Sequence, residues 1–273
     1  MSQSDNVEEL ISTGPVLLSL QNGIAQLKLN RPDNSNGLNV EILKAMYDAV
    51  MQCHGDPRVK VLVLSGAGRH FCAGGDVKVF ASKGEQLPDY LREATSYLQI
   101  IVSALMRLNA PVIASVQGFA AGGGGFGFVC AADMVVAAES SKFLAGATRV
   151  GMAPDAGLSV TLQNLVGFRK AADILLTNPV ITAAEALDMG LVSRVVPDEQ
   201  LLEATHKLAE QLATSARLAL SETKRLLWNG MGSRVETCLA DESRTVSALS
   251  GTEDSREGLA AVIEKRTPNF IGK

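Results

Sequence analysis

The chain has 273 residues, 47% of them hydrophobic, which is enough to bury a large core in one long domain. Its 25 Lys and Arg stand against 29 Asp and Glu, so a net charge of -4 provides no basic field for a phosphate backbone, and nucleic acid is excluded as a main partner. The 4 cysteines are scattered, with no Cys-x-x-Cys pair and no histidine at ligand spacing. This pattern predicts neither a zinc site nor a disulfide framework, and it fits the reducing cytoplasm.

Residues 1–15 are expected to form a short loose tail, because the start of the chain is polar and acidic and lacks the features of a signal or transit peptide. Two apolar segments, 16–20 and 24–29, flank Asn22 and Gly23, a pair that favours a tight hairpin turn. Asn39 is a candidate cap for a helix that runs to about residue 54. The next expected elements are a strand at 61–64, a helix at 89–108, a strand at 112–116, a glycine run at 122–125 and a strand at 134–138.

This alternation of apolar strands with helices predicts an α/β core with parallel pairing, which we place at residues 16–197. The uncharged stretch 109–132 contains several glycines, so we interpret it as buried strand, loop and helix and expect no membrane partner. A short strand is expected at 192–196. Residues 198–273 contain amphipathic helical segments whose apolar faces must cover their own core or a neighbouring subunit: 199–213, 221–229, 235–249 and 255–264.

Two glycine-containing loops, 66–76 and 117–125, follow strands and are candidates for chemistry. Glycine lets the main chain approach a ligand closely, and a helix that begins in the run adds its positive end, so two such loops can bind one oxyanion through backbone N–H groups. For any single glycine loop, a tight turn is the commoner explanation. The run has neither the Lys-Ser/Thr ending of a phosphate loop nor the spacing of a dinucleotide site.

Several motifs together resemble the crotonase (enoyl-CoA hydratase/isomerase) superfamily in order and spacing, from about residue 16 to the C-terminus. They are LNRP at 29–32, NGL at 36–38, FCAGGD at 71–76, PVIA at 111–114, GFAAGGG at 118–124, AAEALDMGLV at 183–192 and REGLAAVIEKR at 256–266. The resemblance implies a spiral of ββα units and a C-terminal helical region, 198–273, used in trimer contacts. It also implies an acyl-CoA thioester held by two backbone N–H groups.

The resemblance places those two donors on Ala73 and Gly123, with Gly124 as the alternative for the second. It implies that coenzyme A enters as part of the substrate, with no separate cofactor and no metal. The expected assembly is a homotrimer or a dimer of trimers. The substrate-binding residues that it implies are Asn34, Ser35, Ala73, Gly74, Gly75, Asp76, Gly123 and Gly124.

The chain departs from the hydratase pattern at both catalytic glutamates. The first position falls on Gly125, Phe126 or Gly127, depending on where one extra residue is placed, and the second falls on Ala147. Without two acid/base groups, the addition of water across a double bond loses the pair that activates the water. A standard hydratase is therefore disfavoured.

Asp155, in the segment VGMAPDAG at 150–157, resembles the single catalytic acid of the enoyl-CoA isomerases, including the ring-epoxide isomerases of phenylacetyl-CoA breakdown. Without the resemblance, an aspartate in such a loop would be a turn residue or helix cap. With it, we expect an acyl-CoA isomerase in which one carboxylate removes a proton, the oxyanion hole holds the enolate, and the same carboxylate returns the proton elsewhere.

Three alternatives stay open: residual hydratase activity, acyl-CoA hydrolysis, and non-catalytic acyl-CoA binding. The position of Asp155 is also the nucleophile of 4-chlorobenzoyl-CoA dehalogenases. However, the histidine base of that group falls on Ser103 and its ring-binding tryptophan falls on Ala147, which argues against dehalogenation.

Overall fold

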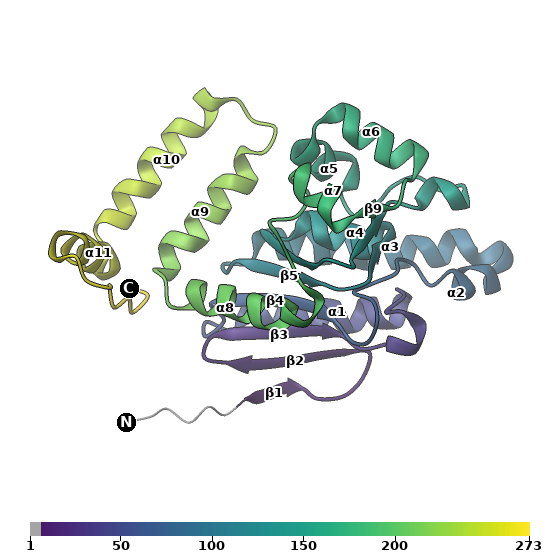
Figure 1. The fold of residues 1–273 in the computed structure, drawn as a ribbon, viewed down its shortest axis with the longest axis horizontal. Helices are drawn as coiled ribbons and strands as arrows, with labels where there is room; N and C mark the ends of the chain where they lie inside the picture. The colour runs from purple at the N-terminus through teal and green to yellow at the C-terminus, as the bar shows by residue number, and fades with distance from the viewer. Residues whose placement is uncertain (1–6) are drawn as a thin grey trace.

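The computed structural model describes residues 7–273 and shows an α/β fold built on a seven-stranded sheet (Figure 1). The strand order is β1-β2-β3-β4-β5-β7-β10, and a second, three-stranded sheet has the order β6-β8-β9. The strands are β1 (Glu8–Ile11), β2 (Val16–Gln21), β3 (Ile24–Leu29), β4 (Val61–Gly66), β5 (Val112–Val116), β6 (Phe119–Ala121), β7 (Met134–Ala138), β8 (Lys142–Leu144), β9 (Ile181–Thr182) and β10 (Arg194–Val196).

The helices account for most of the remaining chain, and their positions agree with the periodicity of the sequence. They are α1 (Val40–Gly55), α2 (Val77–Ser82), α3 (Leu87–Arg107), α4 (Gly122–Ala131), α5 (Leu158–Val166), α6 (Phe168–Thr177), α7 (Ala183–Asp188), α8 (Leu201–Ala213), α9 (Arg217–Gly230), α10 (Val235–Ser250) and α11 (Glu253–Glu264). The predicted cap of the first helix is confirmed, because the side chain of Asn39 accepts a hydrogen bond from the backbone N–H of Ile42 at 3.0 Å.

The predicted parallel core is confirmed: β3, β4, β5, β7 and β10 pair in parallel. Both faces of this sheet are covered at β4, β5 and β7, which is why these strands are almost wholly apolar. On β4, Leu62 and Leu64 belong to the large core cluster that includes α1 and α3, whereas Val61 and Val63 belong to the cluster that includes α8. The carboxyl ends of β4 and β5 lead into the two loops predicted to carry chemistry.

The predicted hairpin is also confirmed, since β2 and β3 pair antiparallel around Asn22 and Gly23, which have φ of 52° and 83°. The expectation of a loose tail is wrong for residues 8–11. These residues form β1, which pairs antiparallel with β2. The pairing provides hydrogen-bond partners for backbone N–H and C=O groups of β2 that would otherwise lie at the edge of the sheet. The part of that expectation concerning residues 1–6 lies outside the described residues.

The C-terminal helices α9, α10 and α11 form an arm that extends away from the sheet (Figure 1). Lys224 fastens α9 to the core: its ammonium group donates to the Leu105 and Ala110 carbonyls at 2.7 and 2.9 Å and pairs with Asp133 at 2.8 Å. Burial lowers the pKa of Lys224, and Asp133 opposes that shift. Trp228 donates to the other oxygen of Asp133 at 2.6 Å. No helix within residues 7–273 is both long and apolar enough to cross a membrane.

Candidate active site

Asn36 holds the first glycine-containing loop in place. Its side chain is buried, and its amide nitrogen lies 2.9, 2.8 and 3.1 Å from the carbonyl oxygens of Ala67, His70 and Phe71. Its side-chain oxygen accepts the backbone N–H of Arg31 at 2.8 Å. The sequence placed Asn36 in a family motif without giving it a role, because partners more than 30 residues away leave no local signal.

Asp76 ends this loop and begins α2. Its carboxylate accepts a hydrogen bond from the guanidinium of Arg31 at 3.2 Å and one from the backbone N–H of Val79 at 3.3 Å. Its own N–H donates to the Leu38 carbonyl at 2.8 Å. Asp76 was predicted to contact substrate, and in this structure both its carboxylate and its N–H have partners within the protein. Its position therefore serves to fix the loop on α2.

The backbone donors of the first loop differ from the sequence prediction. The N–H of Ala73, predicted to be an oxyanion donor, donates to the Ser35 carbonyl at 3.0 Å, so in this structure it already has a partner within the protein. Two residues on, the N–H of Gly75 has no hydrogen-bond acceptor among residues 7–273. Gly75 is therefore a candidate donor of this loop, although the sequence had assigned it only to substrate binding.

The second loop supplies donors because α4 begins inside the glycine run, at Gly122. The N–H groups of the first turn, which include Gly123 and Gly124, have no carbonyl partner within the helix, and Ala121 provides no side-chain cap. The positive end of the helix dipole lies at the same place. Gly123 is therefore suited to the donor role predicted for it, and Gly124 lies one residue further into the same turn.

The two loops meet at Gly74 and Gly122. A Cβ atom on Gly74 would lie 3.0 Å from the Ala121 carbonyl oxygen and 3.3 Å from the Cα of Gly122. A Cβ atom on Gly122 would lie 3.7 Å from the backbone nitrogen of Gly75. Both glycines have positive φ, 97° and 64°, which a side chain would strain. This close approach brings the N–H of Gly75 next to the start of α4.

The carboxylate of Asp155 lies against Gly123. A Cβ atom on Gly123 would overlap Oδ1 of Asp155, and a Cβ on Gly127 would overlap the Ala156 side chain, so α4 carries glycine where the 155–157 loop packs on it. Among residues 7–273, no other residue donates a hydrogen bond to this carboxylate. Burial raises the pKa of Asp155, and its own backbone N–H opposes the shift.

The three possible positions of the first hydratase glutamate are occupied by closely packed residues without an acid. A side chain on Gly125 would overlap the carbonyl oxygen of Cys72. Phe126 is fully buried, with its ring centroid 6.3 Å from that of Phe143. Gly127 lies against the 155–157 loop. Whichever of the three corresponds to the glutamate, none carries an acid, and the aspartate at 155 is the carboxylate brought to the glycine run.

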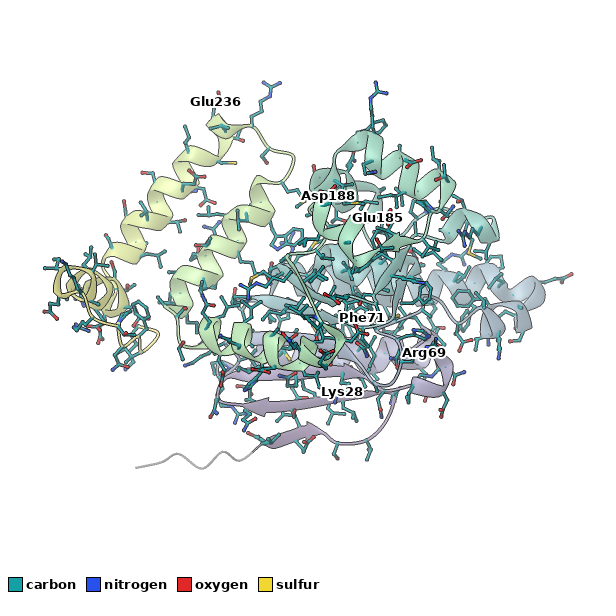
Figure 2. The ribbon with its side chains drawn as sticks, in the orientation of Figure 1. Lys28, Arg69, Phe71, Glu185, Asp188 and Glu236 are labelled. Carbon is teal, nitrogen blue, oxygen red and sulfur yellow. The ribbon has the colours of Figure 1, made fainter. Side chains whose placement is uncertain are left out.

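The remaining predicted residues lie around this centre. Asn34 is exposed at the end of a short 3-10 helix, and Ser35, with φ of 52°, joins it to the first loop through the bond to Ala73. Ala147 begins another 3-10 turn. Phe71, labelled in Figure 2, belongs to the first loop, and its side chain is fully buried. Within residues 7–273, no group of three or more His, Cys, Asp or Glu side chains is placed to hold a metal ion.

Residues 19–273 match the family model described as enoyl-CoA hydratase/isomerase. The chain belongs to this family. It is 33% identical over 259 residues to the crotonyl-CoA hydratase of Syntrophomonas wolfei, covering 94% of this chain and 98% of that protein. It is 32% identical over 260 residues to the 1,2-epoxyphenylacetyl-CoA isomerase of Escherichia coli, again covering 94% and 98%.

The structure is similar to the crystal structure of an enoyl-CoA hydratase from Bacillus anthracis. The TM-score is 0.89 at 30% sequence identity, and the match covers 95% of this chain and 100% of that one. The predicted family and its α/β fold with a C-terminal helical region are therefore confirmed. The names of the relatives include hydratases and isomerases, with hydratases the more frequent. The chain is thus an enzyme of this family, and the family implies an acyl-CoA substrate.

Proposed function

We propose that this protein is an acyl-CoA isomerase that shifts a double bond, or rearranges the acyl group, by proton transfer through an enolate. The observation that carries the proposal is the position of Asp155: its half-buried carboxylate, which has no partner from another residue within 7–273, lies against Gly123, at the helix end suited to bind the thioester oxygen. The donors of the oxyanion hole in this proposal are the N–H groups of Gly75 and Gly123.

One carboxylate is sufficient for this chemistry. Ionised Asp155 removes a proton from the carbon next to the thioester, and the C–H electron pair moves into the carbonyl, whose oxygen becomes the enolate. The two N–H groups stabilise that negative charge. Asp155 then returns the proton to a different carbon, the carbonyl re-forms, and the double bond has moved without any other reactant.

The raised pKa of Asp155 supports this role. A carboxylate whose charge is poorly solvated is a stronger base than an exposed aspartate, and its neutral form is stable enough to hold the proton between the two transfers. Asp76, the other acid of the loops, has its charge compensated by Arg31. The two aspartates thus differ in environment, as expected for one reactive group and one structural group.

Coenzyme A acts in this proposal as the handle of the substrate, and no further cofactor or metal takes part. Asn34 and Ser35 lie beside the first loop and are proposed to contact it, together with Gly74 and Gly124. An acyl-CoA should bind where the free acid does not, because the two donors are suited to a neutral thioester carbonyl that becomes an oxyanion.

The proposed assembly is a homotrimer or a dimer of trimers formed through residues 198–273. The support is the number of large apolar side chains that α10 and α11 expose on an arm outside the core: Val235, Leu239, Val246, Leu259, Val262 and Ile263. Exposed apolar side chains that are grouped in this way are typical of a protein interface, whereas single exposed apolar residues are common on any surface.

Hydration is the second candidate, because relatives such as the Syntrophomonas wolfei protein are named hydratases. In this chain the water would have to be activated by Asp155 alone. A panel of enoyl-CoA thioesters incubated in deuterated water and followed by mass spectrometry separates the candidates. Isomerisation gives deuterium at carbons of the acyl chain and a shifted double bond, whereas hydration adds the mass of one water. A water adduct without a shifted double bond would overturn the proposal.

A further inference from the structure

The ring of Phe80 occupies the side-chain space of Gly75. A Cβ atom on Gly75 would overlap Cε2 of Phe80 and lie 2.6 Å from its Cζ. Phe80 lies on α2, and its N–H donates to the Asp76 carbonyl at 2.9 Å, so the helix that begins at the Arg31–Asp76 pair also carries this ring. The ring is therefore positioned by the same contacts that position the Gly75 N–H.

Tyr90, on α3, packs against the ring of Phe80. The two ring centroids are 6.1 Å apart in an edge-to-face arrangement, with an interplanar angle of 64°. The hydroxyl of Tyr90 accepts the backbone N–H of Val40, the first residue of α1, at 3.0 Å. The ammonium group of Lys83 lies 4.5 Å from the centroid of the Tyr90 ring. Phe80 and Tyr90, called here the aromatic wall, are thus held by α1, α2 and α3 and are only partly buried.

The wall borders the proposed thioester site, because the Phe80 ring lies against Gly75, whose N–H is a proposed donor. A thioester carbonyl carbon has two substituents, the sulfur and the first carbon of the acyl chain. In the proposed function the first acyl carbon lies next to Asp155, which removes its proton. Phe80 lies against Gly75, Asp155 lies against Gly123, and the two loops meet at Gly74 and Gly122. The first acyl carbon is therefore placed near both the wall and the carboxylate.

We propose that Phe80 is a specificity-determining residue that limits the width of the acyl group at the carbon next to the thioester. The enzyme accepts thioesters that are unbranched at this carbon and excludes those with a methyl branch there. The inference rests on the proposed function for the location of the thioester. A ring that packing and Tyr90 hold in place cannot rotate away to admit an extra methyl group. One methyl group that a pocket cannot accommodate gives a preference of about 10–200-fold for the substrate without it.

The test compares butanoyl-CoA with 2-methylbutanoyl-CoA, using calorimetric Kd and the rate of deuterium exchange at the first acyl carbon. The wild type should favour butanoyl-CoA by about tenfold or more. Phe80→Ala should reduce this preference to about threefold or less, chiefly by improving the branched thioester. The matched control is Phe168→Ala, which removes a ring that is 73% exposed on α6 and should leave the ratio unchanged.

Phe80→Leu provides a second variant that keeps an apolar side chain on α2 if the alanine variant does not fold, and it should lower the ratio in the same direction. An unchanged ratio in a folded Phe80 variant overturns the inference, as does a wild type that binds both thioesters equally. The binding ratio is independent of turnover. Selective binding without exchange or isomerisation therefore contradicts the proposed function alone, whereas isomerisation with an unchanged ratio contradicts only the role of Phe80.

Discussion

The carboxylate of Asp155 occupies the space that a side chain on Gly123 would fill. Gly123 does not have positive φ, so glycine is required here for space and not for backbone conformation. Gly123 thus serves two purposes. Its N–H lies in the first turn of α4 and has no partner within the helix, and its lack of a side chain leaves room for the Asp155 carboxylate. The proposed base and the proposed oxyanion donor are therefore fixed relative to each other by direct contact.

Asp155→Asn keeps the size of the side chain and removes the base. We expect turnover to fall about a hundredfold or more, with the Kd for acyl-CoA little changed. Since no other residue within 7–273 donates to this carboxylate, the melting temperature should not fall. The measurements are isomerisation and deuterium exchange at the acyl carbons, calorimetry and thermal unfolding. A variant that melts many degrees lower yet keeps its turnover per folded molecule would show a structural cap instead. A covalent adduct accumulating on Asp155 in the wild type would show a nucleophile.

The pH dependence should report the same group. The base must be ionised, so kcat/KM should decrease as the pH falls through the pKa of Asp155, and burial raises that pKa above its ordinary value. The acid limb should therefore lie at higher pH than an exposed aspartate would give. The check is kcat/KM across the acidic range with a substrate whose own ionisation does not change there. A profile that stays flat down to the ordinary aspartate range contradicts the assignment.

Gly123→Ala should displace Asp155, because the new methyl group overlaps its carboxylate oxygen. We expect a loss of about tenfold or more in turnover, since small displacements of a catalytic group are costly. Gly55→Ala is the matched control: Gly55 lies at the end of α1, and a Cβ there meets no atom within 4 Å. It should be as active as the wild type. Equal kinetics for the two variants would show that the Gly123–Asp155 contact has no part in turnover.

Lys224→Met should destabilise the protein, because it removes the cation that pairs with Asp133 and the donor to two buried carbonyls. Removing one partner of a buried ion pair costs about 3–5 kcal/mol. We expect the free energy of unfolding, measured in urea, to decrease by an amount in this range. Lys44→Met, which breaks a half-exposed pair with Glu93, is the control and should change little. Comparable losses in the two variants would mean that Lys224 is not the attachment of α9.

Val262→Glu should weaken the proposed assembly, because a carboxylate in an apolar interface is costly to desolvate. Val262 lies on α11 and is 78% exposed in the single chain. Light scattering at micromolar concentration should give a trimer or hexamer for the wild type and smaller species for the variant. Val7→Glu, placed just before β1, should leave the assembly unchanged. A monomeric wild type would remove the basis for the proposed interface.

Much of the fold was predictable because its signals are local. Asn22 and Gly23 specify a tight turn, Asn39 caps α1, and apolar runs mark strands that are covered on both faces. The strand β1 was missed because its pattern is polar and exposed, and pairing with β2 defines it. The motifs likewise identified the family, since their order and spacing extend along most of the chain.

The sequence by itself determined the family, a core of parallel strands, and the absence of both hydratase glutamates. Only the tertiary structure decided which backbone N–H groups have partners: the bond from Ala73 to Ser35 joins residues 38 positions apart, whereas the N–H of Gly75 has no acceptor among residues 7–273. It also decided that Asp155 meets Gly123 and that Phe80 covers Gly75. The reason is physical. Residue types and local spacing fix helices, turns and motifs, whereas the availability of a hydrogen-bond donor and the space around a glycine depend on segments that meet only when the chain folds.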